Sequence, residues 1–325
     1  MPVSTSRVMA SILARQFVKL QAPPCSGSEG GGVPPSLRSK PVSSPLILEA
    51  WRRALQSHPA QDFVRDLLKG IEFGFRIGLR SPPPNHQVSS NCPSAQEHSA
   101  VIGDYIRSQV ERGFMAGPFP PQACTSIVCS RMAVIPKKTP GKWRVIVDLS
   151  HPGDRSVNHL IRREATHVAY SSTGDAAHLM HFLGRNALLA KLDIKEAYRI
   201  VPIHPDNRRF LGACWQGQVY VDCQLPFGLA SAPAIFSALG EALEWILRQR
   251  GVKAVIHYID DFLLLGACDH TSDLPGARGP HSPRENRRPR YIHHVPQYSA
   301  GLNIHGSILT AGQAYQATSH GKGGV

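Results

Sequence analysis

Two adjacent carboxylates inside an apolar stretch constrain this chain more than any other feature. Asp260 and Asp261 interrupt the β-favouring apolar residues of 255–266. This pattern predicts two short strands joined by a turn that contains the acids. Two carboxylates a few Å apart repel, and each is driven to hold a proton unless a cation lies between them. Because Mg²⁺ prefers carboxylate oxygen, the stretch predicts a divalent-cation site. An ordinary hairpin with an Asp-rich turn is the alternative.

A third carboxylate favours the cation site. The apolar run of residues 188–192 leads into Asp193, and a helix-like segment follows. An acid at a strand end and an acid pair in a hairpin turn can meet at one edge of a sheet. Two metal ions about 3.5–4 Å apart, held by such acids, would clamp the attacking and leaving oxygens of a phosphoryl displacement. Asp193, Asp260 and Asp261 are therefore candidate catalytic and metal-binding residues.

The order of three motifs resembles a known family. Leu192-Asp193-Ile194-Lys195 followed by Ala197-Tyr198, the Leu-Pro-Phe-Gly-Leu-Ala-Ser-Ala-Pro string of residues 225–233, and Tyr258-Ile259-Asp260-Asp261 are similar to the successive palm motifs of reverse transcriptases. Their order and spacing both match. Residues 51–78 and the Leu-Ser-x-Pro string of 149–152 further resemble DIRS-like retrotransposons.

The resemblance implies an α+β fold of the right-hand polymerase type, with fingers and palm. It implies two Mg²⁺ ions on the three aspartates, with Mn²⁺ as an alternative ion. The implied reaction is attack of a primer 3′-hydroxyl on the α-phosphate of a deoxynucleoside triphosphate. The implied partners are an RNA or DNA template and a DNA primer, while protein partners stay open.

A basic turn is a candidate triphosphate contact. Residues 130–149 predict a hairpin whose turn region carries Lys137, Lys138, Lys142 and Arg144. Four cations suit a triphosphate, and arginine can fork onto two oxygens. A solvated basic turn is the alternative. The segment resembles the fingers hairpin of reverse transcriptases, which carries Arg144 over as a triphosphate contact and Lys137 or Lys138 as a second.

The resemblance adds three more candidate nucleotide-binding residues. It implies that Tyr198 lies under the sugar of the incoming nucleotide, and a packed core tyrosine is the alternative. Gly228 would let the backbone approach a ligand closely. Phe227 stands where some retroviral enzymes carry glutamine, and phenylalanine is common there among retrotransposon relatives.

Composition bounds the partners and the compartment. A net charge of +13 favours polyanionic partners, nucleic acid first, although a basic but unrelated enzyme would also fit. The seven cysteines show no Cys-x-x-Cys or zinc spacing, which predicts reduced thiols in the cytoplasm or nucleus. No apolar run is long enough to span a bilayer, so we expect no membrane partner. Residues 1–22 contain three cations and no acid and weakly resemble a mitochondrial presequence, with an unstructured leader as the alternative.

Five consecutive segments are predicted. Residues 1–45 are a disordered leader and linker rich in Pro, Gly and Ser, 46–120 a helical extension, 121–190 fingers, 191–268 palm, and 269–325 a basic tail of low order. Apolar periodicity ends after residue 270. The helix, the lysine-bearing strand and the thumb that the resemblance implies do not follow, nor does a set of RNase H acids. We expect a missing thumb, through a frameshift, splicing or decay, with an RNA-binding tail as the alternative.

Two rival functions stay open. The first is a catalytically inactive, transposon-derived remnant that at most binds nucleic acid. The second is an unrelated metal-dependent phosphotransferase that uses the acid pair, which the fingers string disfavours.

Overall fold

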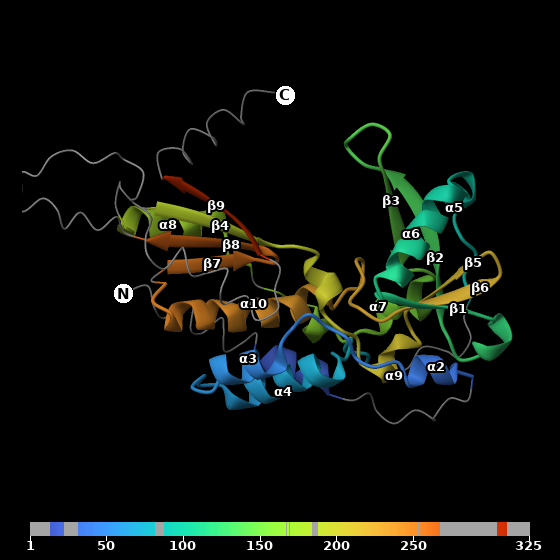
Figure 1. The fold of residues 1–325 in the computed structure, drawn as a ribbon, viewed down its shortest axis with the longest axis horizontal. Coiled ribbons are helices and arrows are strands. Elements are labelled where there is room, and N and C mark those ends of the chain that lie inside the picture. The colour runs from blue at the N-terminus through green and yellow to red at the C-terminus, as the bar shows by residue number, and fades with distance from the viewer. Residues whose placement is uncertain are drawn as a thin grey trace, which may run out of the picture. The chain divides into compact units, whose positions relative to one another are not determined.

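The chain divides into two compact units, each built from segments that are distant in sequence (Figure 1). The computed structural model describes residues 14–22, 32–81, 88–166, 168, 170–183, 188–252, 254–266 and 304–310. The first unit comprises Met1–Ala169 and Glu196–Leu239, and the second comprises Tyr170–Lys195 and Gly240–Val325. This division differs from the predicted consecutive segments, because strands that pair in one sheet come from distant parts of the chain.

Helices make up the N-terminal part of the first unit. Residues 48–54, 61–73 and 99–111 are helical, as expected for the predicted helical extension of residues 46–120. The aligned side chains of the second helix, Phe63, Val64, Leu67 and Ile71, are all buried, as its amphipathic pattern requires. The helices are α2 (Pro35–Arg38), α3 (Leu48–Ala54), α4 (Gln61–Phe73), α5 (Pro93–Glu97) and α6 (Ser99–Glu111).

A five-stranded sheet completes the first unit. Its order is β1-β6-β5-β2-β3, and all pairs are antiparallel except β2 with β5. The predicted β2–β3 hairpin is confirmed, and β5–β6 forms a second hairpin. The second closes on Gln216 and Gly217, both at positive φ, as a two-residue hairpin turn requires. The strands are β1 (Met115–Phe119), β2 (Cys129–Pro136), β3 (Trp143–Asp148), β5 (Gly212–Trp215) and β6 (Gln218–Asp222).

Short elements connect these strands and helices. They are the helices α7 (Val157–Leu160) and α9 (Pro205–Arg208) and the 3₁₀ turns η1 (Pro121–Ala123), η2 (Gly153–Arg155), η3 (Arg163–Ala165) and η4 (Ala197–Ile200).

The second unit is a four-stranded antiparallel sheet of order β7-β8-β4-β9 with helices against it (Figure 1). Helix α8 packs its Leu179, Met180 and Leu183 against Leu189 and Leu265 on one face of the sheet. A capping box starts this helix, since Ser172 N donates to Asp175 Oδ2 and Asp175 N donates to Ser172 Oγ. The elements are α8 (Thr173–Leu183), β4 (Leu188–Ile194), β7 (Ala254–Tyr258), β8 (Asp261–Gly266) and β9 (Ile304–Thr310). Helix α10 (Ala232–Gln249) belongs to both units.

The C-terminal tail contains a strand that the sequence did not predict. β9 pairs with β4 from Leu188↔Thr310 to Ile194↔Ile304. The expectation of low order is therefore wrong for residues 304–310. The edge of β4 offers a row of unpaired backbone groups, and pairing with it needs little side-chain periodicity. Residues 267–303 and 311–325 lie outside the described residues.

The predicted disorder of residues 1–45 is also wrong where the structure describes them. Residues 14–21 are helical, and the Phe17 ring meets those of Phe63 and Phe75 at 5.6 and 6.1 Å. Further along, Lys40 O accepts from the buried Arg208 at 2.7 Å. Side-chain donors from the core thus satisfy a Pro-rich segment that has no periodicity of its own. Residues 1–13 and 23–31 lie outside the described part.

The described residues bear on the cysteines and on possible membrane spans. Cys92, Cys124, Cys129, Cys214 and Cys223 are free thiols. No helix in the described ranges is both long and apolar enough to cross a membrane. Cys25 and Cys268 lie outside those ranges.

Glu241 on α10 carries a buried carboxyl group near His257 of the second unit's sheet. The pKa of Glu241 is raised to about 7, chiefly by burial and in part by the negative charge of Glu244. The positive charges of His257 and Arg248 act in the opposite direction. A folded-state pKa above the unfolded value means that the folded protein keeps a proton that the unfolded chain has lost.

Glu241→Gln is expected to flatten the pH dependence of stability. In wild type, the protonated Glu241 carboxyl makes its full contribution to the free energy of unfolding below about pH 4.5. This contribution is lost as the pH rises through about 7. The variant should therefore match wild type at pH 4.5 and exceed it at pH 8 by on the order of 1–3 kcal/mol. Urea unfolding at both pH values measures this, with Glu111→Gln, an exposed glutamate on α6, as control. Equal stability of variant and wild type at pH 8 would contradict it.

Candidate active site

Strand pairing brings the predicted acids together at one end of the second unit's sheet. Asp193 at the end of β4 lies directly opposite Asp261 at the start of β8. Residues paired in this way share a face, with Cβ atoms about 4.5–5.5 Å apart. The backbone of Asp260 joins them, because its carbonyl accepts from Ile194 N at 3.1 Å. All three candidate catalytic residues thus occupy one edge of one sheet.

The turn that carries the acid pair is strained. Tyr258 pairs with Asp261, so Ile259 and Asp260 form a two-residue loop. Ile259 has φ 56°, a left-handed conformation that a β-branched residue rarely adopts. Such a residue costs on the order of 1–3 kcal/mol and persists only where surrounding structure holds it. Here β4 and β7 hold it, because they pair with β8 on both sides.

The charges at this edge are only partly balanced. Lys191, which shares the face of Asp193, places Nζ 2.8 Å from Asp261 Oδ1. This hydrogen bond raises the pKa of Lys191. Burial raises the pKa of Asp260, and the neighbouring charges of Asp261 and Asp193 raise it further. One lysine thus faces three carboxylates.

The donor chemistry fits a hard divalent cation. Three carboxylates supply only oxygen ligands, which Mg²⁺ and Mn²⁺ prefer. The negative charges of Asp261 and Asp193 add to burial in raising the pKa of Asp260. Among the described side chains, no group of three or more His, Cys, Asp or Glu is arranged to hold a metal ion. The strands therefore bring the ligands to one place, and the three-ligand arrangement itself is not present.

The predicted triphosphate contacts lie in the first unit. Arg144 pairs with Ile135 near the tip of the β2–β3 hairpin, and Lys137 N donates to Lys142 O at 2.8 Å. Lys137, Lys138 and Arg144 are exposed. Within the described residues, none of the three forms an ion pair, so their charges are available to an anionic ligand.

Two aromatic candidates are in contact. The Tyr198 ring packs against Phe227 at 5.1 Å and edge-on against Phe236 at 5.8 Å. Tyr198 is buried, whereas Phe227 is 65% exposed. The core contacts fit the packed-tyrosine alternative and also fix the ring, so a role beside the nucleotide sugar stays a prediction.

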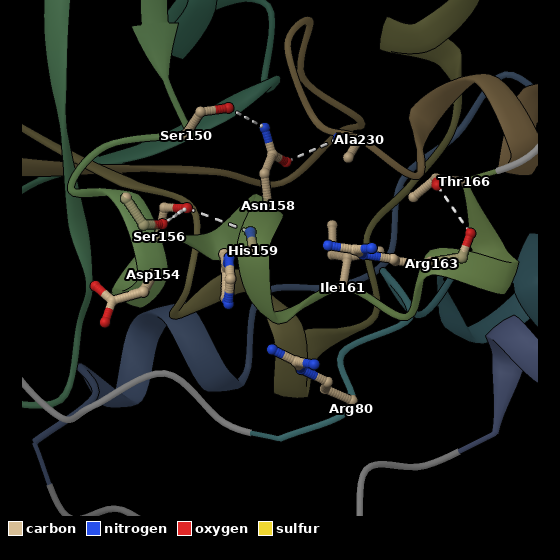
Figure 2. A pocket seen from close by; sticks show the side chains of 11 residues that line it. Arg80, Ser150, Asp154, Ser156, Asn158, His159, Ile161, Arg163, Thr166 and Ala230 are labelled. Carbon is tan, nitrogen blue, oxygen red and sulfur yellow. Dashed lines mark hydrogen bonds between the residues drawn. The ribbon is translucent and has the colours of Figure 1, made fainter.

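The turn at Gly228 is held by Asn158, for which the sequence predicted no contact. Gly228 has φ 88°, and a Cβ there would lie 3.4 Å from Val147 O. Asn158 Nδ2 donates to Gly228 O at 2.8 Å, and Asn158 Oδ1 accepts from Ala230 N at 2.8 Å. Figure 2 shows this side chain reaching Ala230 and Ser150. A lone asparagine after a hairpin carries no signal of such a long-range contact.

Beside Asn158 lies a pocket of about 800 Å³. Arg80, His159 and Arg163 line it together with one acid, Asp154. In Figure 2 the two arginines and His159 surround one space, and the Asp154 carboxylate points away from them. The pocket therefore has an excess of cationic and polar groups. The remaining lining residues are Ser150, Gly153, Ser156, Asn158, Ile161, Thr166 and Ala230.

Residues 135–275 match the family described as "Reverse transcriptase (RNA-dependent DNA polymerase)". The chain contains a reverse-transcriptase domain. The matched segment includes Arg144, Tyr198 and the three aspartates, and the α+β class is confirmed by the helices and mainly antiparallel sheets. The narrower assignment to DIRS-like retrotransposons stays a prediction.

Relatives of the reverse-transcriptase domain occur in viral polyproteins. The Pro-Pol polyprotein of Simian foamy virus type 1 is 25% identical over 190 residues, 58% of this chain and 14% of the relative. The genome polyprotein of Petunia vein clearing virus (isolate Shepherd) is 27% identical over 124 residues, 38% of this chain and 5% of the relative. The chain thus spans a small part of the curated relatives that it matches.

Solved structures similar to this chain include two of foamy viral protease-reverse transcriptase. A selenomethionine-labelled CSH mutant of the Prototype Foamy Virus protein has a TM-score of 0.46 at 17% identity, covering 82% of this chain and 33% of that one. A foamy viral dRH form in complex with ds DNA has a TM-score of 0.41 at 17% identity, covering 70% of this chain and 40% of that one.

Asp260→Asn is expected to stabilise the metal-free reverse-transcriptase domain. The raised pKa of Asp260 shows that the fold disfavours its charge, and asparagine removes that charge at nearly constant size. Since the group is partly exposed, the gain should be about 1 kcal/mol or less. Urea unfolding at pH 7.5 in a chelating buffer measures it, with Glu164→Gln, an exposed carboxylate, as control. A destabilised Asp260→Asn would show that repulsion does not dominate at this edge.

Proposed function

We propose that the chain is an RNA-directed DNA polymerase fragment of a retroelement polyprotein. The observation that carries the proposal is the pairing of Asp193 with Asp261 beside Asp260 inside the matched family segment. The reaction is attack of a primer 3′-hydroxyl on the α-phosphate of a deoxynucleoside triphosphate, with release of pyrophosphate. The reduced thiols fit a setting in the cytoplasm or nucleus.

Asp193, Asp260 and Asp261 would hold two Mg²⁺ ions. Bound there, the ions would lower the pKa of the primer hydroxyl and neutralise charge on the leaving phosphate oxygens. The aspartates would hold these ions in place because the β4–β8 ladder fixes the backbones of Asp193 and Asp261. Lys191 offsets part of the carboxylate charge and must give up Asp261 Oδ1 when a cation takes that oxygen.

Residues of the first unit would bind the substrate. Arg144 would fork onto two phosphate oxygens, and Lys137 or Lys138 would add charge as a point contact. Tyr198 and Phe227 would bound the sugar side of the nucleotide. Asn158 would keep the Gly228 turn open to the ligand, because its side chain ties that turn to the loop after β3.

Asp260→Asn is expected to abolish primer extension, because losing one carboxylate charge removes a metal ligand while barely changing size. Purified protein would be incubated with an RNA template, a DNA primer, deoxynucleoside triphosphates and Mg²⁺ at low salt, where phosphate contacts are strongest.

Arg144→Ala should instead raise the KM for nucleotide by about tenfold in the same assay, since one forked charge-assisted contact is lost.

Two results would count against this assignment. Extension that survives Asp260→Asn would exclude the three aspartates as the catalytic acids. Mg²⁺-dependent nucleotide binding without any extension by wild type would favour the inactive remnant.

Arg80 and Arg163 are expected to bind nucleic-acid phosphates. Replacing both by alanine should weaken binding of a template–primer duplex and lower the slope of log K against log salt by about 2, since each lost phosphate contact reduces it by about 1. Fluorescence anisotropy of a labelled duplex, titrated at several salt concentrations between 50 and 200 mM, measures the slope. Arg107→Ala, on an exposed face of α6, is the control. An unchanged slope would exclude the pocket as a phosphate contact.

A further inference from the structure

A buried polar network lies on the face of the second unit's sheet opposite the aspartates. Side chains alternate along a strand, so His257 and Phe262 face away from Tyr258 and Asp261. His257 and Phe262 are paired across β7 and β8 and are both buried. Their rings stack at 5.3 Å with an interplanar angle of 21°. This pair is the last one before the turn on the face that meets α10.

Helix α10 contacts this pair through a hydrogen bond between Glu244 and His257. A hydrogen bond of 3.1 Å joins Glu244 Oε2 to His257 Nδ1. The other oxygen, Oε1, accepts from Arg248 Nε at 3.0 Å and Nη2 at 2.7 Å. Arg248 Nη2 also donates to the carbonyl of Val255 on β7 at 2.9 Å. The helix therefore holds both the backbone and a side chain of the strand that leads into the turn.

The network keeps Glu244 ionised although its side chain is only 13% exposed. Burial alone would raise the pKa of Glu244, but the hydrogen bond from His257 and the charge of Arg248 lower it below its ordinary value. A buried carboxylate with three donors is costly to disturb, because removing one partner leaves charge uncompensated.

A glycine lets the imidazole approach the helix. A Cβ at Gly240 would lie 2.8 Å from both Cδ2 and Nε2 of His257. Glycine inside a helix costs about 1 kcal/mol relative to alanine. The contact therefore depends on a residue that weakens the helix, which indicates that the placement of the His257 ring matters more than helix propensity at this position.

We propose that Glu244 and His257 are positioning residues for the Asp260–Asp261 turn. The proposal rests on the proposed function for its catalytic part. His257 is three residues before Asp260, and the strained Ile259 stands between them. A strained turn keeps its conformation only if its flanks are fixed. The ladder to β4 fixes the β8 side, and the Glu244–His257–Arg248 network fixes the β7 side.

The Ile194 amide reports the position of the turn directly, because it donates to Asp260 O. Glu244→Gln keeps the shape of the side chain and removes its charge. Hydrogen exchange at the Ile194 amide should then accelerate by about tenfold, the effect of losing one hydrogen bond to a charged group. Glu241→Gln is the matched control, with the same change on the same helix and no hydrogen bond to β7 among the described residues, and exchange is compared at pH 4.5, where this variant is expected to match wild type in stability. It should leave this exchange rate unchanged.

Gly240→Ala provides a second test that keeps the helix folded, because alanine favours helix while its Cβ displaces His257. It should also accelerate exchange at Ile194. If neither Glu244→Gln nor Gly240→Ala changes this rate relative to the control, the positioning role is overturned, whether or not the protein extends primers.

Kinetics test the catalytic part separately. In primer extension, Glu244→Gln should lower kcat by about tenfold with the KM for nucleotide unchanged, because the contacts on the β2–β3 hairpin are untouched. Faster exchange with an unchanged kcat would overturn the catalytic part. If the variants exchange faster but the wild-type protein itself shows no primer extension, the positioning of the turn is supported and the proposed function is contradicted instead.

Discussion

The cross-strand pairing of two aspartates is the constraint on which the second unit depends. Strand pairing sets Asp193 opposite Asp261, and like charges directly opposite are destabilising. The backbone adds strain at Ile259. A fold selected for stability alone would avoid both features. Their coexistence at one sheet edge is typical of sites where stability is given up for function.

The rest of the sheet offsets this cost in different ways on its two faces. On the face of the acids, Lys191 contributes a cation, and the Tyr170 ring packs on Tyr258 at 4.8 Å. On the opposite face, apolar packing is interrupted by the Glu244–His257–Arg248 network. A buried ionic network contributes little net stability compared with apolar packing, but it specifies one geometry. That specificity is what a turn bearing the proposed metal ligands requires.

The first unit relies on long-range side-chain-to-backbone hydrogen bonds. Asn158 links the loop after β3 to the Gly228 turn, and the buried Arg208 holds the extended segment at Lys40. The buried pair of Arg199 with Asp222, at 2.5 Å, fixes the 3₁₀ turn that carries Tyr198. These contacts fix the positions of irregular segments that have no apolar periodicity. They therefore help to hold the backbone of the first unit, which carries the exposed cations.

The sequence by itself determined the local elements and the identity of the acids. Amphipathic periods gave α4 and α6, the Ser172–Asp175 box gave the start of α8, and alternating apolar runs gave the hairpins, because these patterns act within a few residues. Motif order also named Asp193, Asp260 and Asp261 as one set.

Only the tertiary structure decided which residues meet across long stretches of chain. Asn158 with Gly228, Glu244 with His257, and β9 with β4 depend on pairing between distant segments, and a single polar residue or a short strand carries no periodic signal of its partner. The predicted disorder failed in the described parts of both ends for the same reason, since those parts gain order from hydrogen bonds and packing that other parts of the fold supply.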